Sequence, residues 1–420
     1  MSGATLYVDV VETNPPLVFY EMIGLTFGTL TREAYMLGVC AVILVTFGWL
    51  LARAGRLQAV AGLLAMTVGA GLDFGQRDHI VVAFILPFLV LEGQSRKGEA
   101  AVGFWAFLGV GLKPHFILIP ACAMIATAIQ ERSFGPLFSW RARSLAVSLI
   151  AYAGFVAAIH PAYLQEIVPL GLFVYWAYGQ AYFESLRPLV LTILGLYALA
   201  RGLVDGRPLL VRLSGALFGA LAAFYLQGKN WPYHQVPAQS LILLILILIF
   251  FADKRIGRSA CAILVSVCGL FGVAAYAAGG ERQAYVPGDA RSILFLSPHV
   301  WAAYPISLDR RLKQVSRYPA LWPLPGAWST YKDAKRSPAD RNRAKAILMQ
   351  TRRNILTDIR IGKPDYIYED VRRRKPYFRA PFNYSGFLGN GLANYRPIGR
   401  HGMWLVYVRT DRPRSNAKAN

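Results

Sequence analysis

The stretch HQVPAQSLILLILILIFF, residues 234–251, decides the class of fold to which this chain belongs. From Leu241 to Phe251 every residue is Leu, Ile or Phe, and a basic connector with Lys254 and Arg255 follows. A helix that crosses the hydrocarbon core of a bilayer needs about 20 largely apolar residues. The sequence therefore predicts a transmembrane helix here.

Nine further apolar blocks accompany this stretch. They occupy approximately residues 33–54, 57–72, 79–92, 100–112, 114–130, 144–160, 187–203, 208–226 and 258–278. The blocks at 79–92 and 100–112 are short, but they alternate with polar connectors in the same way as the longer blocks do. Because 55% of the 420 residues are hydrophobic and only 16% are charged, a soluble globule would lack polar surface. The sequence predicts an α-helical polytopic membrane protein with about ten spans.

The basic residues predict the orientation of these spans, since loops rich in Lys and Arg stay in the cytoplasm. Basic residues occupy every second connector: Arg53, Arg56, Arg96, Lys97, Arg132, Arg141, Arg143, Arg201, Arg207, Arg212, Lys254, Arg255 and Arg258. The alternate connectors are Asp73–Asp78, Lys113, His160–Glu184 and Gln227–Gln235, which are richer in aromatic, His and amide side chains. We expect these connectors to form an exterior binding face, and His160–Arg187 to be an interfacial helix or a lid.

Three domains are predicted from the change in composition. Residues 1–32 form an exterior loop with an interfacial helix at Leu17–Leu30, residues 33–280 the transmembrane helical domain, and residues 281–420 a basic exterior α/β domain. The last domain has predicted strands at residues 291–297, 364–369 and 402–408 and a helix at 340–358. The formal charge of +22 raises the possibility of nucleic acid, but a basic tail beside a bilayer is attracted to anionic headgroups. No nucleic-acid partner is expected.

The same alternation of connectors puts both termini on the exterior side of a cytoplasmic membrane. The segment Met1–Thr13 is polar and lacks the pattern of a secretory signal peptide. An exterior N-terminus without a signal predicts one more helix upstream. The alternative is a short polar tail that its neighbouring helix translocates.

Acidic, basic and aromatic residues gather in three exterior clusters. Asp9 and Glu12 lie three residues apart before Pro15-Pro16, where helix capping and solvation are an equal alternative to a functional role. Gln76, Arg77, Asp78 and His79 open the block at 79–92. Polar groups at that depth are costly unless paired or solvated. An ion pair between Arg77 and Asp78 would explain part of this cluster, but it leaves Gln76 and His79 unexplained.

Two exterior lysines lie close to aromatic and amide residues. Lys113 separates two apolar blocks, where it can extend to the interface or bind a lipid phosphate as a point charge. The segment 227–235 contains Lys229, Trp231, Tyr233, His234 and Gln235. Trp and Tyr are ordinary interface anchors, but aromatic faces with amides are also what sugar recognition requires.

The stretch Tyr7-x-Asp9-x-x-Glu12-x-Asn14-Pro15-Pro16-Leu17 resembles the acidic first exterior loop of GT-C fold membrane glycosyltransferases. The likeness is to the bacterial branch similar to protein O-mannosyltransferases and lipid A aminoarabinose transferases. An Arg-acid cluster opening a later helix, the Gly111-x-Lys113 junction and a C-terminal exterior domain are similar as well. The resemblance implies transfer of a sugar from a polyprenyl-phosphate carrier to a hydroxyl of a glycan, lipid or protein acceptor.

The resemblance also implies roles for individual residues. Asp9, Glu12 and Asp78 would be catalytic. Arg77, Lys113 and Lys229 would bind the lipid phosphate. The substrate-binding residues would be Gln76, His79, Trp231, Tyr233, His234 and Gln235. In the family the principal acid follows an upstream first helix that this chain lacks, so either Asp9 or Glu12 takes its role or the sequence is N-terminally shortened.

Two other classes of function remain open at this stage. A transporter or flippase of lipid-linked sugars would use the same cations without an acidic base, although no convincing internal repeat is present. A non-catalytic scaffold of an envelope assembly machine would need no acid either. The four cysteines lack the spacing of a metal site. The sequence predicts no definite cofactor, and it leaves the presence of a divalent metal open.

Overall fold

The computed structural model describes residues 4–179, 186–251, 285–304, 306–371 and 384–411. The chain divides into two compact units. The first, which we call the α/β unit, comprises Met1–Thr13, His160–Tyr178 and Gly279–Asn420. The second, the helical unit, comprises Asn14–Ile159 and Gly179–Ala278. The α/β unit is thus assembled from three separated stretches of sequence.

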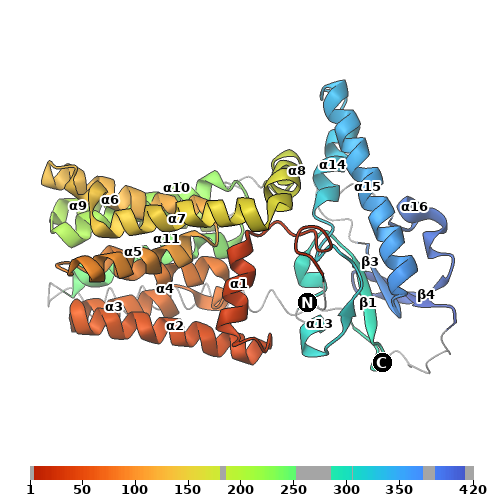
Figure 1. Cartoon of the computed structure of the whole chain (residues 1–420), viewed down its shortest axis with the longest axis horizontal. Coiled ribbons are helices and arrows are strands. Elements are labelled where there is room, and N and C mark those ends of the chain that lie inside the picture. Colours follow the sequence, from red (N-terminus) through yellow and green to blue (C-terminus); the bar gives the residue numbers. More distant parts are fainter. Residues whose placement is uncertain (1–3, 180–185, 252–284, 305, 372–383, 412–420) are drawn as a thin grey trace. The chain divides into compact units, whose positions relative to one another are not determined.

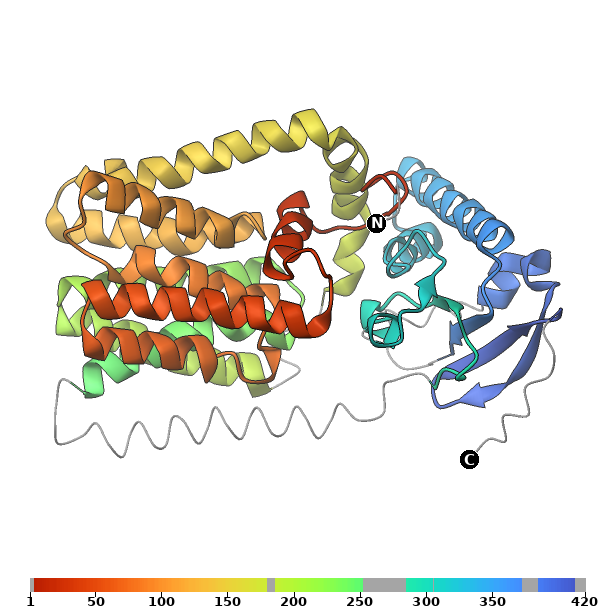
Figure 2. The ribbon, with the colours of Figure 1, turned by 60° about the horizontal axis from the view of Figure 1, so that its bottom comes forward.

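The described part of the helical unit is built almost entirely from α-helices (Figure 1). They are α1 Pro16–Leu25, α2 Arg32–Arg53, α3 Arg56–Thr67, α4 Arg77–Val90, α5 Arg96–Val110, α6 Leu118–Glu131, α7 Trp140–Ile159, α9 Leu186–Asp205, α10 Pro208–Leu226 and α11 Val236–Phe250. The 3₁₀ turn η2, Pro114–Ile117, leads into α6, and η7, Pro232–Gln235, leads into α11. Most of these helices lie side by side along a common direction in both views (Figures 1 and 2).

Six helices among the described residues are long and apolar enough to cross a membrane. They are Arg32–Arg53, Pro114–Glu131, Trp140–Ile159, Leu186–Asp205, Pro208–Leu226 and Pro232–Phe250. The membrane character predicted from the sequence is therefore supported, but the count of about ten spans is not confirmed. The predicted spans at 57–72, 79–92 and 100–112 correspond to α3, α4 and α5, which have only 12, 14 and 15 residues. The predicted span at 258–278 lies outside the described residues.

Helix α4 is the centre of the helical unit. Every residue from Asp78 to Val90 is buried, and the helix packs against α2, α3, α5, α6, α10 and α11. At 1.5 Å per residue a 14-residue helix is about 21 Å long, which is shorter than a bilayer core of about 30 Å. A helix that is apolar on all sides is either a membrane span or a core helix. Here the apolar sides of α4 are covered by protein.

The buried Arg141 and the partly buried Arg212 close the C-terminal end of α4, where the last carbonyls of a helix have no partners within it. From α7, Arg141 donates to the carbonyl oxygens of Phe88 and Leu91, each at 2.7 Å, and forms an ion pair with Glu99. From α10, Arg212 donates from Nε to the Leu89 carbonyl oxygen at 2.7 Å and pairs with Glu92. Both side chains thereby fix α4 to its neighbours.

Helix α1 lies across one end of the helical unit (Figure 1). Its Leu17 amide donates to the Tyr152 hydroxyl of α7 at 3.0 Å. Its last turn packs closely on α2, because a Cβ at Gly38 would lie 2.1 Å from the Leu25 carbonyl oxygen. This helix corresponds to the predicted interfacial segment Leu17–Leu30, although it is shorter.

The α/β unit contains a five-stranded sheet with strand order β2-β1-β3-β5-β4. The strands are β1 Ser292–Leu296, β2 Lys313–Gln314, β3 Tyr366–Asp370, β4 Tyr395–His401 and β5 Trp404–Arg409. Strand β1 is parallel to β2 and β3, whereas β5 is antiparallel to β3 and β4. Strands β1, β3 and β5 occupy the three predicted strand segments, and α15, Pro338–Gly362, covers the predicted helix. The small C-terminal α/β fold is confirmed.

Separated segments pack together within the α/β unit. Its helices include α8 Val168–Val174, α13 Ile306–Asp309, α14 Pro323–Lys332 and α16 Tyr384–Leu388, together with the turns η4 Tyr163–Ile167 and η5 Tyr175–Tyr178. The Val11 amide donates to the Arg317 carbonyl oxygen at 2.9 Å, and the Trp322 indole donates to the Val11 carbonyl oxygen at 3.1 Å. The ring of Tyr7 is buried beside Tyr163. The N-terminal segment is therefore part of this unit's core.

The contacts of Arg141 predict a large effect of removing its side chain. The substitution Arg141→Ala would leave the largely buried Glu99 carboxylate without its partner and two carbonyl oxygens without donors. We expect it to lower the free energy of unfolding by about 3–5 kcal/mol. Equilibrium unfolding of the detergent-solubilised chain measures this change.

The exposed Arg143, two residues along α7, is the matched control. We expect Arg143→Ala to change the free energy of unfolding by less than about 0.5 kcal/mol. The double variant Arg141→Met/Glu99→Met should recover most of the lost stability, because no charge is then left alone. Equal effects of the two single alanine variants would contradict the assignment.

Candidate functional site

Three connections between helices bring polar side chains together at one end of the helical unit. They are the connections that lead into α4, into η2 and into η7. We use the name polar cluster for the side chains of Asn14, Arg77, Asp78, Lys113, His115, Lys229, Trp231, Tyr233 and His234. Most of these residues interact directly or electrostatically with Lys113, namely Arg77, Asp78, His115, Lys229, Tyr233 and His234. Residues that are far apart in sequence thus form one site.

The ion pair between Asp78 and Lys113 is the centre of the polar cluster. The Lys113 Nζ lies 2.6 Å from the Asp78 Oδ2, and the two side chains are 12% and 1% exposed. The same Nζ lies 5.1 Å from the centre of the Tyr233 ring and 5.7 Å from that of Phe116. Burial lowers the pKa of Lys113 to about 8, although the Asp78 charge opposes the shift. The ammonium group is therefore enclosed by one carboxylate and two aromatic faces.

Arg77 makes a different contact from the one that its sequence neighbour suggests. Its Nη1 donates a hydrogen bond to the side-chain oxygen of Asn14, which precedes Pro15-Pro16 and the start of α1. The expected Arg77–Asp78 ion pair is not among the contacts of these residues; Asp78 pairs with Lys113 instead. The Asn-Pro-Pro element consequently has a physical role, because it holds a guanidinium group at the polar cluster.

Lys229 belongs to a loop in which three rings lie in contact. Its Nζ lies 5.1 Å from the centre of the Trp231 ring. The His234 ring lies 4.5 Å from that of Tyr233 and 5.3 Å from that of Trp231, measured between ring centres. Burial, followed by the charges of Lys113 and Arg77, lowers the pKa of Lys229 to about 7, while Asp78 raises it. Three cationic side chains and one carboxylate therefore act on each other here.

Several buried polar atoms near the cluster have no hydrogen-bond partner among the described residues. They are the Asp78 Oδ1, the His115 Nε2, the His234 Nδ1 and the Gln235 Nε2. A buried polar group without a hydrogen bond costs about 1–3 kcal/mol. Such groups need an explanation in a native protein. These atoms can still form hydrogen bonds, and three cationic side chains lie near them. The arrangement therefore suits a polar, anionic ligand.

The remaining predicted site residues of the helical unit have contacts of other kinds. Gln76 is exposed at the N-cap of α4. The His79 Nδ1 accepts a hydrogen bond from the Gly75 amide at 2.9 Å, and its Nε2 lies 2.5 Å from the Met66 carbonyl oxygen. The His79 ring thus joins the turn before α4 to α3. The predicted substrate-binding role of these two residues stays a prediction.

Asp9 and Glu12 belong to the α/β unit. Asp9 is exposed, and its Oδ2 accepts a hydrogen bond from the Thr5 amide at 2.7 Å. The Glu12 Oε1 accepts from the Thr13 amide at 2.7 Å and from the Thr13 hydroxyl at 3.1 Å. These local bonds shape the turn before Pro15. The catalytic role of both acids stays a prediction.

Sequence reasoning missed the acid Glu21 of the helical unit, and it placed Asp73 in an exterior connector without giving it a role. Glu21 lies on α1, its Oε1 is buried without a hydrogen-bond partner among the described residues, and burial raises its pKa to about 8. Burial and the Asp78 charge raise the pKa of Asp73 to about 6, against the charge of Arg187. The signal for Glu21 was present in the sequence, because it is the only charged residue in the apolar run Leu17–Leu30.

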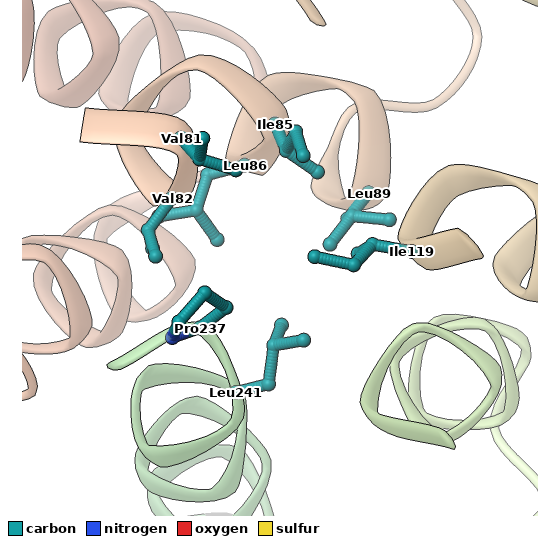
Figure 3. A pocket seen from close by; sticks show the side chains of 8 residues that line it. All are labelled: Val81, Val82, Ile85, Leu86, Leu89, Ile119, Pro237 and Leu241. Atoms are coloured by element: carbon teal, nitrogen blue, oxygen red, sulfur yellow. The ribbon is translucent and has the colours of Figure 1, made fainter. Parts of the chain in front are cut away.

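An apolar pocket lies between the helices that begin at the polar cluster. Figure 3 shows the side chains that line it: Val81, Val82, Ile85, Leu86, Leu89, Ile119, Pro237 and Leu241. Of these, α4 contributes five, α6 contributes Ile119, and α11 contributes Pro237 and Leu241. Because its lining is entirely apolar, this small pocket offers no hydrogen-bond partner to a water molecule.

No group of three or more His, Cys, Asp or Glu side chains in the described part of the chain is arranged to hold a metal ion. Comparison with known proteins finds no match to any family model, curated protein or solved structure. The chemistry of the polar cluster is therefore inferred from its own residues.

The lowered pKa of Lys229 predicts that anion binding depends on pH. A lysine with a pKa of about 7 is charged below that pH and becomes neutral as the pH rises through it. We expect the affinity for sulfate, whose charge is constant in this range, to fall about tenfold or more between pH 6 and pH 8.5, since a hydrogen bond to a charged group contributes about 1.5–3 kcal/mol. The dependence of the melting temperature on sulfate concentration measures this affinity.

The variant Lys229→Arg keeps its charge throughout this range and should abolish the part of the pH dependence centred near pH 7, leaving the part that Lys113 contributes near its pKa of about 8. Lys97→Arg, a substitution of an exposed lysine in the first turn of α5, is the matched control and should leave the dependence unchanged. A pH profile that is the same in the Lys229→Arg variant as in the unaltered chain would overturn the role of Lys229.

Proposed function

We propose that this protein is a membrane glycosyltransferase of the GT-C type. It transfers a sugar from a polyprenyl-phosphate carrier to an acceptor hydroxyl at the outer face of the bacterial cytoplasmic membrane. The observation that carries the proposal is the polar cluster, in which Arg77, Lys113 and Lys229 surround the buried Asp78. Three cations around one acid suit a substrate that contains both a phosphate and a reactive sugar carbon.

The proposed topology has about ten spans, with both termini and the polar cluster on the exterior side. The opposite end of the helical unit carries features of a cytoplasmic interface. The guanidinium groups of Arg96 and Arg143 lie 5.9 and 5.2 Å from the centre of the Trp140 ring, beside the exposed Phe134 and Phe138. Aromatic residues with Lys and Arg are typical of that boundary. The polar cluster then faces the exterior.

The donor would bind with its two chemically different halves in two neighbouring environments. The phosphate would contact Lys113, Lys229 and Arg77, which act as charge-assisted donors. The isoprenoid chain would follow the apolar walls of α4, α6 and α11, where the pocket of Figure 3 lies. The sugar would lie against the rings of Trp231 and Tyr233, with His234 and Gln235 as hydrogen-bonding groups.

The proposed reaction is a single displacement at the anomeric carbon. A carboxylate, Asp78 or one of Asp9 and Glu12, accepts the proton of the acceptor hydroxyl while the hydroxyl oxygen forms a bond to that carbon. The bond between the carbon and the phosphate oxygen breaks, and the phosphate leaves with the electron pair. Cations stabilise the charge that develops on the leaving group. The products are the glycosylated acceptor, polyprenyl phosphate and a protonated carboxyl group.

One observation favours a second candidate function, a transporter or flippase of lipid-linked sugars. Asp78 is engaged by Lys113 at 2.6 Å, so a carboxylate in this state has less capacity to accept a proton. A flippase needs cations for the phosphate but no base. The two functions differ in whether a covalent bond of the carrier is broken.

The transferase is tested with the full chain in liposomes that contain undecaprenyl phosphate carrying mannose, N-acetylglucosamine or aminoarabinose. With an acceptor lipid or glycan fraction, we expect release of undecaprenyl phosphate from at least one donor. Removal of a general base lowers a rate by about 10²–10⁴-fold. We therefore expect the substitution of the residue that acts as the base, which is Asp78→Asn in the helical unit or else Asp9→Asn or Glu12→Gln in the α/β unit, to lower the rate by this factor.

The matched control is Asp205→Asn, an acid in the connector at the opposite end of the helical unit that pairs with Arg207. It should leave the rate within about twofold of the unaltered chain. If no donor releases undecaprenyl phosphate but the chain moves these donors between leaflets, and Asp78→Asn preserves that movement, the flippase is the correct function.

A further inference from the structure

A surface of the α/β unit combines cations, aromatic rings and exposed apolar side chains. It is formed by α8, η5, the end of α14, residues 333–337 and the start of α15, and we refer to it as the cation-aromatic face. Helices α8 and α14 pack together, as do α14 and α15, and all three are labelled in Figure 1. The proposed transferase site does not use these residues.

Long basic side chains of this face lie over aromatic rings. The Lys332 Nζ lies 4.9 Å from the centre of the Trp328 ring. The guanidinium of Arg336 lies 5.0 Å from the Trp176 ring, and that of Arg343 lies 4.3 Å from the Phe173 ring. Arg343 also donates to the Pro169 carbonyl oxygen at 3.3 Å. The rings of α8 and η5 and the charges of α14 and α15 therefore form one continuous surface.

The excess of positive charge on this face is large. Residues 332–345 contain six Lys or Arg and two Asp, a net charge of +4. At the start of α15, Asp340 accepts a hydrogen bond from the Ser337 hydroxyl at 2.8 Å. The Asp333 Oδ2 lies 3.8 Å from the Arg336 Nε. These two acids compensate only part of the charge, so the face complements an anionic partner.

Exposed apolar side chains accompany these cations. Leu172 is 82% exposed and Trp176 is 43% exposed. Helix α8 has the sequence VPLGLFV, without a charged residue. A Cβ at Gly326 would lie 2.0 Å from the Val174 carbonyl oxygen, so α14 holds α8 by direct backbone contact. Apolar residues beside a basic, aromatic border are typical of a segment that lies in the membrane interface.

The chain itself brings this face near a bilayer. Helix α7 is one of the six candidate membrane spans and ends at Ile159. Leu172 follows 13 residues later, after η4 and the first turn of α8. Thirteen residues can extend over about 45 Å at most, and helical residues cover far less. The covalent connection therefore limits the distance between Leu172 and the end of the candidate span α7.

We propose that the cation-aromatic face binds the surface of an anionic phospholipid bilayer. Lys332, Lys335 and Arg336 contact the phosphate groups, and Leu172 and Trp176 enter the boundary between headgroups and acyl chains. The contact is independent of sugar transfer. It gives the α/β unit a second attachment to the membrane besides its covalent links.

The test uses the full chain in lipid nanodiscs. In a variant whose four native cysteines are replaced by Ala, Leu172→Cys carries an environment-sensitive fluorophore. The discs contain phosphatidylcholine alone or a 7:3 mixture with phosphatidylglycerol. In the anionic discs we expect blue-shifted emission and about threefold stronger quenching by lipids spin-labelled near the headgroup, because each basic residue adds to the attraction.

Two controls are matched to this probe. Ile398→Cys on β4 is also partly exposed, at 42%, and should report a solvent-like environment in both discs. The triple variant Lys332→Glu/Lys335→Glu/Arg336→Glu should remove the response to phosphatidylglycerol at Leu172→Cys. High salt should weaken the response of the Leu172→Cys probe to phosphatidylglycerol when Lys332, Lys335 and Arg336 are unchanged. This measurement tests the role of charge without substituting these three residues.

A solvent-like emission of the Leu172→Cys probe in both discs, equal to that of Ile398→Cys, would overturn the proposal. So would a response that appears only when an acidic protein is added. Retained sugar transfer in the triple variant separates this contact from the proposed transferase activity, since each can then fail without the other.

Discussion

The burial of one carboxylate and one ammonium group inside an apolar bundle governs the arrangement of the helical unit. Removing either partner of such a pair leaves an unpaired charge, which is strongly destabilising. Asp78 opens α4 and Lys113 follows α5, so their contact sets how these helices align. Arg141 and Arg212 bind the other end of α4. Charged side chains from neighbouring segments therefore hold both ends of the central helix. The residues around Asp78 are held in place by the same contacts.

Much of the fold follows from the sequence, but the limits have physical causes. Within the described residues the apolar blocks predicted the positions of the helices, and short runs rich in apolar and aromatic residues predicted β1, β3 and β5. Composition alone does not separate a span from a core helix, so the prediction that α4 is a span is not confirmed for a helix that protein covers. Strand β2 has two residues and β4 contains Pro397 with an irregular register, so neither has a clear pattern.

The sequence predicted which residues belong to the candidate site, but it did not predict which of them pair with each other. Clustered polar residues pointed to Arg77, Asp78, Lys113 and the loop of Lys229. The partners come from 35 and 63 residues away, as for Asp78 with Lys113 and Arg77 with Asn14. Such pairings depend on how the helices pack, which local sequence does not specify. A single acid such as Glu21 escapes notice because it has no polar neighbours along the chain.

The composition of the α/β unit from three separated stretches has a consequence for biogenesis. Residues 4–13 and 160–178 pack with described residues beyond 285, which the ribosome makes after the helical unit. Contacts between distant parts of a chain form late and slowly. The backbone hydrogen bond between Val11 and Arg317 can form only after synthesis of the helical middle of the chain. The α/β unit therefore completes its packing only after the helical unit has been synthesised.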